Sequence, residues 1–212
     1  MSKKGKFIVV EGPEGGGKTT QVKMLIDRMR QEGRKVDTWR EPGGTELGEY
    51  IRGIVKNNDA GEPPVPVAEL FLFEAARAQL VENCIRPALE AGHDVVLDRF
   101  YDSTTAYQGY GRGMDPDELE DLHMMATGGL QPDISVLLYV DPEVGIKRAQ
   151  ARNEGAYDRF DEEALDFHRR VCEGYYKISC QGVRKWIVID ASYSIEQVSM
   201  NLWQIILPEI IR

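Results

Sequence analysis

A glycine-rich turn at residues 12–19 restricts the folds open to this chain more than any other segment does. The turn reads GPEGGGKT and fits the pattern GxxxxGK[ST]. It follows the apolar run at 7–10, which predicts a buried strand, and it precedes apolar residues at 22–29 that are spaced as on one face of a helix. A strand, such a turn and a helix in this order predict an α/β fold with the turn at the carboxyl end of a strand.

The same turn predicts a binding site for a nucleoside triphosphate. Successive glycine N–H groups can surround phosphate oxygens, and the start of the helix adds partial positive charge. Lys18 would reach the β and γ phosphates, and the Thr19 hydroxyl would hold Mg²⁺. A turn that matches by chance is the alternative, and the flanking strand and helix argue against it. The residues expected to bind the triphosphate are Gly12, Pro13, Glu14, Gly15, Gly16, Gly17, Lys18 and Thr19.

Further apolar runs predict the rest of a sheet. They lie at 94–97, 134–140 and 186–189, with a weaker one at 35–40, and helical spacing such as that at 195–206 separates them. Continuously apolar strands separated by helices predict a five-stranded parallel sheet with helices on both faces, the three-layer α/β fold of P-loop NTPases. The 212 residues allow one domain of ordinary size. The polar stretches at 57–66 and 152–161 predict a surface loop and a mobile insert.

Charge and composition exclude several classes of protein. Lys and Arg number 26 against 35 Asp and Glu, and the net charge of -9 argues against a nucleic-acid or anionic membrane partner. No apolar run approaches the ~20 residues of a membrane span, and the one near the N-terminus is too short for a signal peptide. The three cysteines, Cys84, Cys172 and Cys180, lack metal-site spacing and predict reduced thiols in the cytoplasm. Small anions bound by local positive charge stay possible as ligands.

Two further features narrow the kind of triphosphate enzyme. The chain contains no guanine-reading NKxD element and is too short for a motor or transport ATPase, which favours a small nucleotide kinase. Asp98 and Arg99 directly follow the predicted strand at 94–97, at the sheet edge where ligands gather in such folds. The carboxylate can hold the Mg²⁺ shell, and the guanidinium suits a phosphate monoester. A local surface ion pair is the alternative.

Five segments in order resemble bacterial thymidylate kinase over essentially the whole chain: EGPEGGGKTTQ, REPGGT, LFLFEAARAQL, DRFYDSTTAYQG and RAQARNEGAYDRF. The fourth is the most specific. The resemblance implies a nucleoside monophosphate kinase fold, with one domain over 1–212 and a lid insert at about 148–160. It also implies transfer of the γ-phosphate of ATP to dTMP, a need for Mg²⁺, and a homodimer. A kinase of the same fold for another nucleoside monophosphate, or a nucleotide-binding regulator without turnover, are the alternatives.

The resemblance also assigns the acceptor site. Phe73 would stack on thymine and Arg77 would hydrogen-bond its carbonyl, an i, i+4 pair on one helix face. A core phenylalanine beside a surface arginine is the alternative. Arg99 would anchor the monophosphate with help from Arg40, and Glu14 would accept a hydrogen bond from the 3′-OH unless it is simply a solvated carboxylate. The expected pocket wall is Ser103, Thr104, Tyr107 and Gln108, where Tyr107 would exclude a ribose 2′-OH and Ser103 could equally be a cap.

The expected catalytic residues are Lys18, Arg99, Glu14, Arg152 and Arg159. The phosphate-binding turn lacks the arginine that some members of the family carry there, so the positive charge must come from Arg152, Arg159 or Arg148, which resemble the lid arginines of another bacterial subtype. Solvated helix charges are the alternative. No general base is needed, because a phosphate monoester is largely dianionic at neutral pH. Adenine contacts are expected from the lid side and the segment before Asp190.

Overall fold

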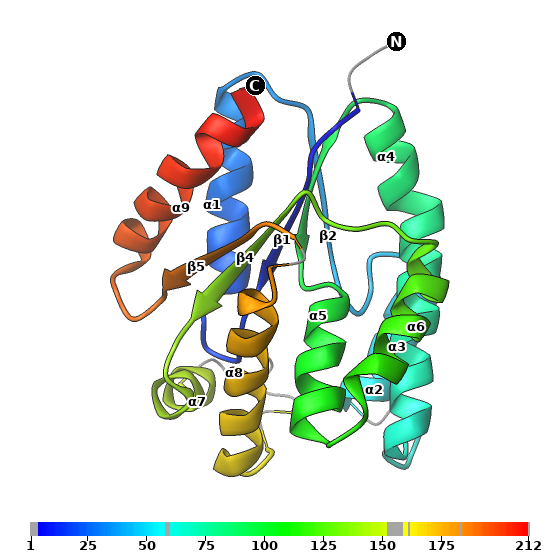
Figure 1. The fold of residues 1–212 in the computed structure, drawn as a ribbon. Coiled ribbons are helices and arrows are strands. Elements are labelled where there is room, and N and C mark those ends of the chain that lie inside the picture. The colour runs from blue at the N-terminus through cyan, green and yellow to red at the C-terminus, as the bar shows by residue number, and fades with distance from the viewer. Residues whose placement is uncertain (1–3, 58–59, 152–158, 161, 183, 212) are drawn as a thin grey trace.

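The computed structural model describes residues 4–57, 60–151, 159–160, 162–182 and 184–211. Five parallel strands form one sheet in the order β2-β3-β1-β4-β5 (Figure 1). The strands coincide with the five predicted apolar runs to within one residue at each end, and the predicted α/β fold is confirmed. The strands are β1 (Phe7–Glu11), β2 (Val36–Arg40), β3 (Asp94–Asp98), β4 (Ile134–Tyr139) and β5 (Trp186–Asp190).

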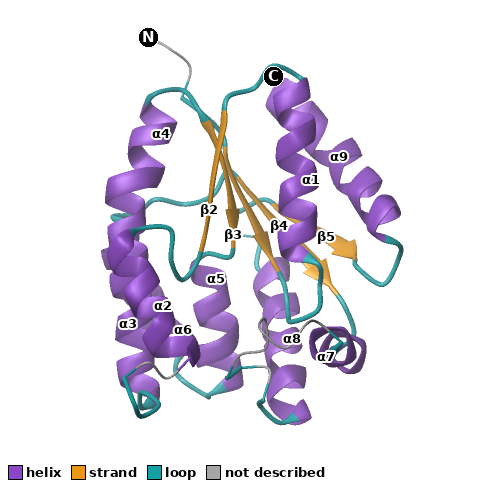
Figure 2. Ribbon diagram, turned by 180° about the vertical axis from the view of Figure 1, so that it is seen from behind, coloured by secondary structure: helices purple, strands orange, loops and turns teal. Residues whose placement is uncertain are grey.

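Helices cover both faces of the sheet, which makes three layers (Figure 2). One face carries α1 (Lys18–Gln31) and α9 (Ile195–Ile211). The other carries the helical path α3 (Pro66–Leu80), η1 (Val81–Ile85) and α4 (Arg86–Glu90), together with α5 (Tyr101–Thr104), η2 (Thr105–Gly111) and α8 (Leu165–Cys180). The remaining helices of the described chain are α2 (Glu46–Asn57), α6 (Pro116–Thr127) and α7 (Pro142–Gln150).

The central strand shows why the strands read as unbroken apolar runs. Ile8 and Val10 pack against α1 and α9, while Phe7 and Val9 pack on the opposite face against η1 and α4. All four side chains are at most 1% exposed. A parallel strand that is buried on both faces needs an apolar side chain at every position, so the usual alternation disappears.

Backbone geometry brings the glycine-rich turn against the sheet. Gly12 has a φ of 148°, and a Cβ at this position would lie 2.5 Å from the carbonyl oxygen of Leu138 in β4. Gly17 has a φ of 79° and immediately precedes α1. Glycine tolerates both the positive φ and the close approach of another strand. The turn therefore lies at the carboxyl ends of β1 and β4.

The described residues were searched for helices that could cross a membrane and for groups that could bind a metal. Among the described helices, none combines the length and the apolar character that crossing a membrane requires. Within the same described residues, no three or more His, Cys, Asp or Glu side chains gather into a metal-binding group.

Candidate active site

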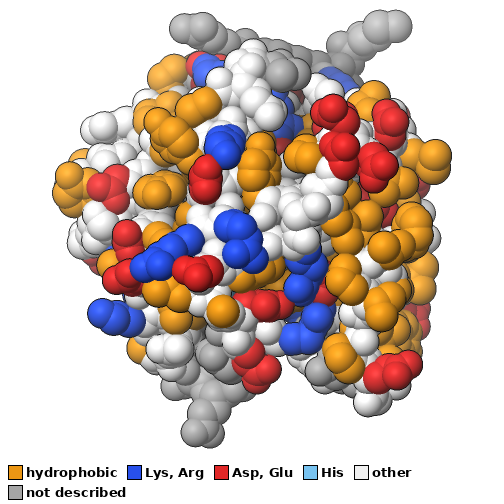
Figure 3. Space-filling view, turned by 60° about the horizontal axis from the view of Figure 1, so that its bottom comes forward, with side chains coloured by type: hydrophobic (Ala, Val, Ile, Leu, Met, Phe, Trp, Pro, Cys, Tyr) orange, Lys and Arg blue, Asp and Glu red, His pale blue; other side chains and the backbone are white. Residues whose placement is uncertain are grey.

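Two adjoining cavities open at the carboxyl end of the sheet. The larger has a volume of about 840 Å³, within the range of about 300–1,000 Å³ typical of ligand sites. It is lined by residues 14–21 of the glycine-rich turn and α1, by Asp98 and Arg99, and by Ala191 and Tyr193 on the far side. The smaller is a narrow slot beside α3 and η2. Figure 3 looks toward this end, where Lys and Arg side chains gather among carboxylates.

The slot and the larger cavity adjoin one another, and four residues line both: Glu14, Glu41, Lys56 and Arg99. Most of the side chains that the sequence predicted for the acceptor site line this slot. Its lining consists of Glu14, Glu41, Pro42, Lys56, Phe73, Arg77, Arg99, Phe100, Ser103, Thr104, Tyr107, Gln108 and Phe160. One exception among the expected residues is Arg40, which lines the larger cavity and pairs with Glu49 at 2.8 Å.

The side chain of Lys18 folds back onto the glycine-rich turn. Its Nζ donates hydrogen bonds to the carbonyl oxygens of Gly12 at 3.0 Å and Pro13 at 2.8 Å. Burial lowers the pKa of Lys18 to about 8, and the nearby charge of Arg99 adds to this effect. Lys18 is therefore a cation whose present partners are neutral carbonyls, although its site favours a negatively charged ligand.

Thr19 and Asp98 lie together at the mouth of the turn. The Thr19 hydroxyl donates to the Asp98 carboxylate at 2.7 Å, joining the start of α1 to the end of β3. Hydroxyl and carboxylate oxygens are the hard ligands that Mg²⁺ prefers, and this ion commonly binds proteins through one or two such groups plus phosphates and water. The two side chains therefore fit the Mg²⁺ site expected from the sequence.

Arg99 and Glu14 form the ion pair at the junction. Nη2 of Arg99 lies 2.6 Å from Glu14, and the Tyr107 hydroxyl donates to the same carboxylate oxygen at 2.9 Å. Burial alone would raise the pKa of Glu14, but the charges of Arg99 and Lys18 hold that pKa well below its usual range. Glu14 is thus a paired, ionised group with a side chain only 12% exposed, so the alternative of a solvated carboxylate is wrong.

A second carboxylate, that of Glu11, contacts the same hydroxyl groups as Arg99. Glu11 is fully buried at the end of β1 and accepts hydrogen bonds from the Phe100 N–H at 2.7 Å, the Ser103 hydroxyl at 2.7 Å and the Tyr175 hydroxyl at 3.1 Å. Arg99 donates to the same Ser103 and Tyr175 hydroxyls at 3.2 and 3.1 Å. Ser103 is therefore a bridge between Glu11 and Arg99 rather than a cap. Burial raises the pKa of Glu11.

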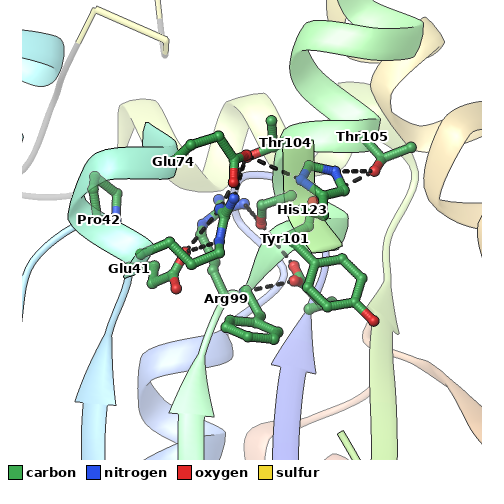
Figure 4. A network of polar contacts seen from close by, with 12 residues as sticks. Glu41, Pro42, Glu74, Arg99, Tyr101, Thr104, Thr105 and His123 are labelled. Carbon is green, nitrogen blue, oxygen red and sulfur yellow. Dashed lines mark hydrogen bonds and ion pairs between the residues drawn. The ribbon is translucent and has the colours of Figure 1, made fainter. Parts of the chain in front are cut away.

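Arg77 is the most tightly held arginine of the slot. It is 1% exposed, and Glu41 at 2.8 Å, Glu74 at 2.5 Å and the Thr104 hydroxyl at 3.0 Å surround its guanidinium (Figure 4). It is not a surface arginine. Phe73 lies one helical turn earlier on the same wall, with its ring centroid 6.1 Å from that of Phe160. The predicted i, i+4 pair therefore faces one cavity.

The Arg77 network continues away from the slot through residues that the sequence did not identify (Figure 4). Nδ1 of His123 lies 3.0 Å from Glu74, and its Nε2 lies 3.0 Å from the Thr105 hydroxyl. The ring of Tyr101 stacks on His123 at a centroid distance of 5.2 Å. Glu74 stands three positions before Arg77, a spacing that could have indicated the pair. His123 comes from α6 and carried no such signal.

The remaining expected residues lie in different places, and only Gln108 lines the slot. Gln108 is 1% exposed and donates its amide to Glu69 at 2.8 Å. Arg159, expected near the phosphates, instead bonds the Val55 carbonyl at 2.9 Å and pairs with Glu69. Arg152 lies outside the described residues. Arg148 lines the larger cavity and donates to the Ala191 carbonyl at 2.7 Å, in the segment after Asp190 rather than before it.

Two basic residues of α2 also line the larger cavity and were missed from the sequence. Arg52 and Lys56 stand four positions apart, and Arg52 donates to the Pro42 carbonyl at 2.9 Å. Their i, i+4 spacing beside the REPGGT segment was the available signal. Together with Lys18, Arg99 and Arg148 they give the cavity the local positive charge that the acidic chain as a whole lacks.

Comparison with known proteins gives one consistent result. The family model described as thymidylate kinase matches residues 10–202. A thymidylate kinase from Synechococcus sp. is 46% identical over 204 residues, which cover 96% of this chain and 95% of that protein. A thymidylate kinase from Thermomicrobium roseum is 48% identical over 197 residues, which cover 93% of this chain and 92% of that protein. One from Deinococcus radiodurans is 43% identical over 199 residues, covering 94% and 95%.

Proposed function

The chain belongs to the thymidylate kinase family, and from that membership we propose how its two cavities divide the family's reaction. It is a nucleoside monophosphate kinase that transfers the γ-phosphate of ATP to dTMP, giving dTDP and ADP in dTTP biosynthesis. The observation that carries the proposal is the junction of the two cavities, where the ion pair of Glu14 and Arg99 is among the residues that line both. A donor in one cavity and an acceptor in the other would bring their phosphates together there, as direct transfer requires.

The larger cavity takes ATP. Its triphosphate would lie along residues 12–19, where Lys18 would exchange the carbonyls of Gly12 and Pro13 for β- and γ-phosphate oxygens. Thr19 and Asp98 would hold Mg²⁺, which neutralises phosphate charge when it is bound. The nucleoside end would lie toward Arg148, Ala191 and Tyr193, on the side of the cavity away from the slot.

The slot takes dTMP. Phe73 would stack on the base and Arg77 would donate to its carbonyl, while Glu74 and Glu41 hold that guanidinium in place. Arg99 would bind the monophosphate, and Arg40 would assist from the larger cavity. The other acceptor contacts are proposed for Glu14 with the 3′-OH, and for Ser103, Thr104, Tyr107 and Gln108 with the base and sugar.

Catalysis in this proposal comes from positioning and charge. The acceptor phosphate is itself the nucleophile, so no residue has to remove a proton. Lys18 and Arg99 would stabilise the charge on the transferring group from the two sides of the junction. Arg152 and Arg159 are proposed to add charge from an insert at about 148–160. The contacts of Arg159 with Glu69 and Val55 mean that it would have to change partners to do so.

We further propose that residues 1–212 form one kinase domain that acts as a cytoplasmic homodimer. Exposed apolar side chains on neighbouring helices support the dimer, because Phe71 on α3 is 55% exposed and Met125 on α6 is 81% exposed. Hydrophobic side chains gather on the right of Figure 3, where these helices lie. All three cysteines are free thiols, which is typical of a reducing compartment.

A coupled assay of ADP release tests the acceptor. The panel is dTMP, dUMP, the ribonucleotide of thymine, dCMP and dGMP, and we expect dTMP to give the highest kcat/KM. Equal values for dTMP and dCMP, or no turnover with any acceptor, would overturn the acceptor assignment. Phe73→Ala should raise KM for dTMP while leaving KM for ATP within a factor of two, because only the slot loses a wall.

The insert arginines need a separate measurement. Arg152→Ala should lower kcat far more than it changes the Kd of dTMP, because an interaction made only in the transition state affects turnover alone. Lys23→Ala, on the exposed side of α1, is the matched loss of a cation and should leave kcat unchanged. An effect of Arg152→Ala on affinity alone would show that its proposed role is wrong.

A further inference from the structure

Glu69 near the start of α3 is a fully buried carboxylate at the end of the slot away from the phosphates. Its Oε1 accepts from the Gln108 amide and from Nε of Arg112, each at 2.8 Å. Its Oε2 accepts from Nη2 of Arg112 at 3.3 Å and from Arg159. One amide and two guanidiniums therefore share a single carboxylate, and this side chain does not itself line either cavity.

This contact determines which end of the Gln108 amide faces the slot. A carboxylate paired with two guanidiniums can only accept hydrogen bonds, so the Gln108 NH₂ group must point toward Glu69. The Gln108 carbonyl oxygen is then the atom left for the slot, and it has no hydrogen-bond partner among the described residues. A base that enters the slot therefore meets a hydrogen-bond acceptor at this position.

We infer that Glu69 is a positioning residue that selects thymine over cytosine through Gln108. The inference rests on the proposed function, in which the slot receives the base of the acceptor nucleotide. Thymine carries a hydrogen on N3 and needs an acceptor beside it, whereas N3 of cytosine is a lone pair that needs a donor. Glu69 holds the donor end of Gln108 away from the base, so the carbonyl oxygen matches thymine and repels cytosine.

Because of the surrounding charges, the substitution Glu69→Gln should reverse which end of the Gln108 amide faces the slot. Arg112 can only donate, and it contacts position 69 whether or not Arg159 changes partners, so it would hold the one remaining carbonyl oxygen of the new side chain. Its NH₂ group would then face Gln108, whose carbonyl would turn to accept from it. The NH₂ group of Gln108 would in consequence face the slot. Two donors would meet at N3 of thymine, and a donor would meet the N3 lone pair of cytosine.

The test compares kcat/KM for dTMP and dCMP in four variants. Glu69→Gln should lower the dTMP to dCMP ratio at least tenfold, the factor expected for one hydrogen bond lost or reversed, with the loss for dTMP mainly in KM. Glu163→Gln is the matched control, because Glu163 pairs with the same Arg112 at 3.0 Å without touching Gln108. It should leave the ratio unchanged. A Gln108→Ala variant and the double variant with Glu69→Gln complete the cycle.

The four variants separate the possible failures. If Gln108→Ala leaves the ratio unchanged, Gln108 does not read the base and the proposed acceptor contacts are wrong. If Gln108→Ala lowers the ratio and Glu69→Gln does not, only the role of Glu69 is wrong. A merely structural role for Glu69 predicts lower kcat for both acceptors at a constant ratio. In the Gln108→Ala background, Glu69→Gln should change the ratio no further, and an additional change would also overturn the inference.

Should Glu69→Gln fail to fold, the wild-type protein provides a second measurement. Side-chain amide protons of Gln108, assigned by their loss in Gln108→Ala, should exchange slowly with solvent because they bond a buried carboxylate. We expect both the exchange rate and the proton shift to stay nearly constant when dTMP is added. A large dTMP-induced shift of these protons would show that the NH₂ group meets the base, which contradicts the inference.

Discussion

Arg99 is the single residue on which most of the site geometry depends. Its backbone has a φ of 70°, a left-handed conformation that is uncommon for a residue with a side chain. That turn directly after β3 sends the guanidinium toward Glu14, Ser103 and Tyr107 at once. Strained conformations of this kind persist where the surroundings fix them, and here four side-chain partners do so.

Lys18 provides a prediction about protons. Its pKa is lowered to about 8 by burial and by Arg99, and bound phosphates would raise that pKa again. Above pH 8, Lys18 in the empty site is mostly deprotonated, and it must take up a proton when a nucleotide binds. The affinity for ADP should therefore fall as the pH rises from 8 to 9. Calorimetry in two buffers of different ionisation enthalpy measures the uptake directly.

Lys18→Arg should abolish both the proton uptake and this slope, because an arginine stays charged throughout the range. The exposed Lys23→Arg is the control and should behave as the wild type does. A slope that persists unchanged in Lys18→Arg would assign the titration to another group.

Glu74 provides a prediction about stability. Burial raises its pKa, but Arg77 and His123 outweigh this and bring the pKa to about 2, below the ordinary value of 4.5. Because the unfolded chain then binds more protons than the folded one, the ion pair stabilises the fold above pH 4.5 and this stabilisation is lost as pH falls toward 2. Glu74→Gln should lower the free energy of unfolding at pH 7 by on the order of 3 kcal/mol.

Urea unfolding at pH 7 and pH 3 checks this. The difference in unfolding free energy between the two pH values should be smaller in Glu74→Gln than in the wild type. Glu82→Gln removes a carboxylate that is 63% exposed and pairs with Arg86, and it should change the unfolding free energy by less than about 0.5 kcal/mol. Equal pH dependence in the wild type and Glu74→Gln would rule out this account.

The sequence predicted those site residues whose grouping depends on short spacing along the chain. Phe73 and Arg77 are four apart on one helix, and Lys18 and Thr19 belong to one short turn, so both groupings could be predicted. Glu69 and His123 could not, and neither could the contact that Glu74 makes with His123. Gln108 and Glu69 are 39 positions apart and His123 and Glu74 are 49 apart, and only the packing of α3 against η2 and α6 brings them together.

At the level of elements, α8 packs unusually closely on η2. Gly174 of α8 lies against Tyr110, and a Cβ at this position would stand 2.7 Å from atoms of that side chain. From the next residue, Tyr175, the hydroxyl reaches Glu11 and Arg99. The absence of a side chain at Gly174 thus lets α8 bring a support for the phosphate junction into reach.

Gly174→Ala should therefore destabilise the fold, although alanine favours helices over glycine by about 1 kcal/mol. We expect a loss of about 1–3 kcal/mol in unfolding free energy, the usual result of overpacking, together with a lower kcat. Thermal or urea unfolding measures it, and Glu173→Ala on the exposed side of α8 should remain within about 0.5 kcal/mol of the wild type. Stabilisation by Gly174→Ala would mean that Tyr110 moves aside without cost.

The strands were predictable and the helix irregularities were not. The inner strands β1, β3 and β4 are mainly apolar and buried on both faces, so their own residues indicate them, whereas the edge strand β2 gave a weaker signal. In contrast, η1 and η2 are wide π-helical turns that interrupt the paths of α3–α4 and α5. Pro87 lacks an N–H and its ring crowds the carbonyl one turn earlier, which explains the widening at η1. Such turns depend on how the tertiary packing absorbs an extra residue.

At the level of the whole molecule, the dimer is the property that single residues can test most directly. Phe71 and Met125 lie exposed on adjacent helices, and a glutamate at Phe71 would place a charge in the proposed interface. Phe71→Glu should shift the protein from dimer to monomer in sedimentation velocity at micromolar concentration. Met200→Glu, on α9 across the sheet, should stay dimeric. A wild type that sediments as a monomer would contradict the dimer proposal.

The direction of the strands has a practical consequence for handling the molecule. All five run toward the two cavities, and α9 returns from that end, so β1 begins and α9 finishes at the opposite pole (Figure 1). A fluorescent protein, affinity tag or surface linker joined near Lys4 or Ile211 would hang from the pole remote from nucleotide entry. Immobilised on a sensor chip by either end, the molecule would present its open side to the flow.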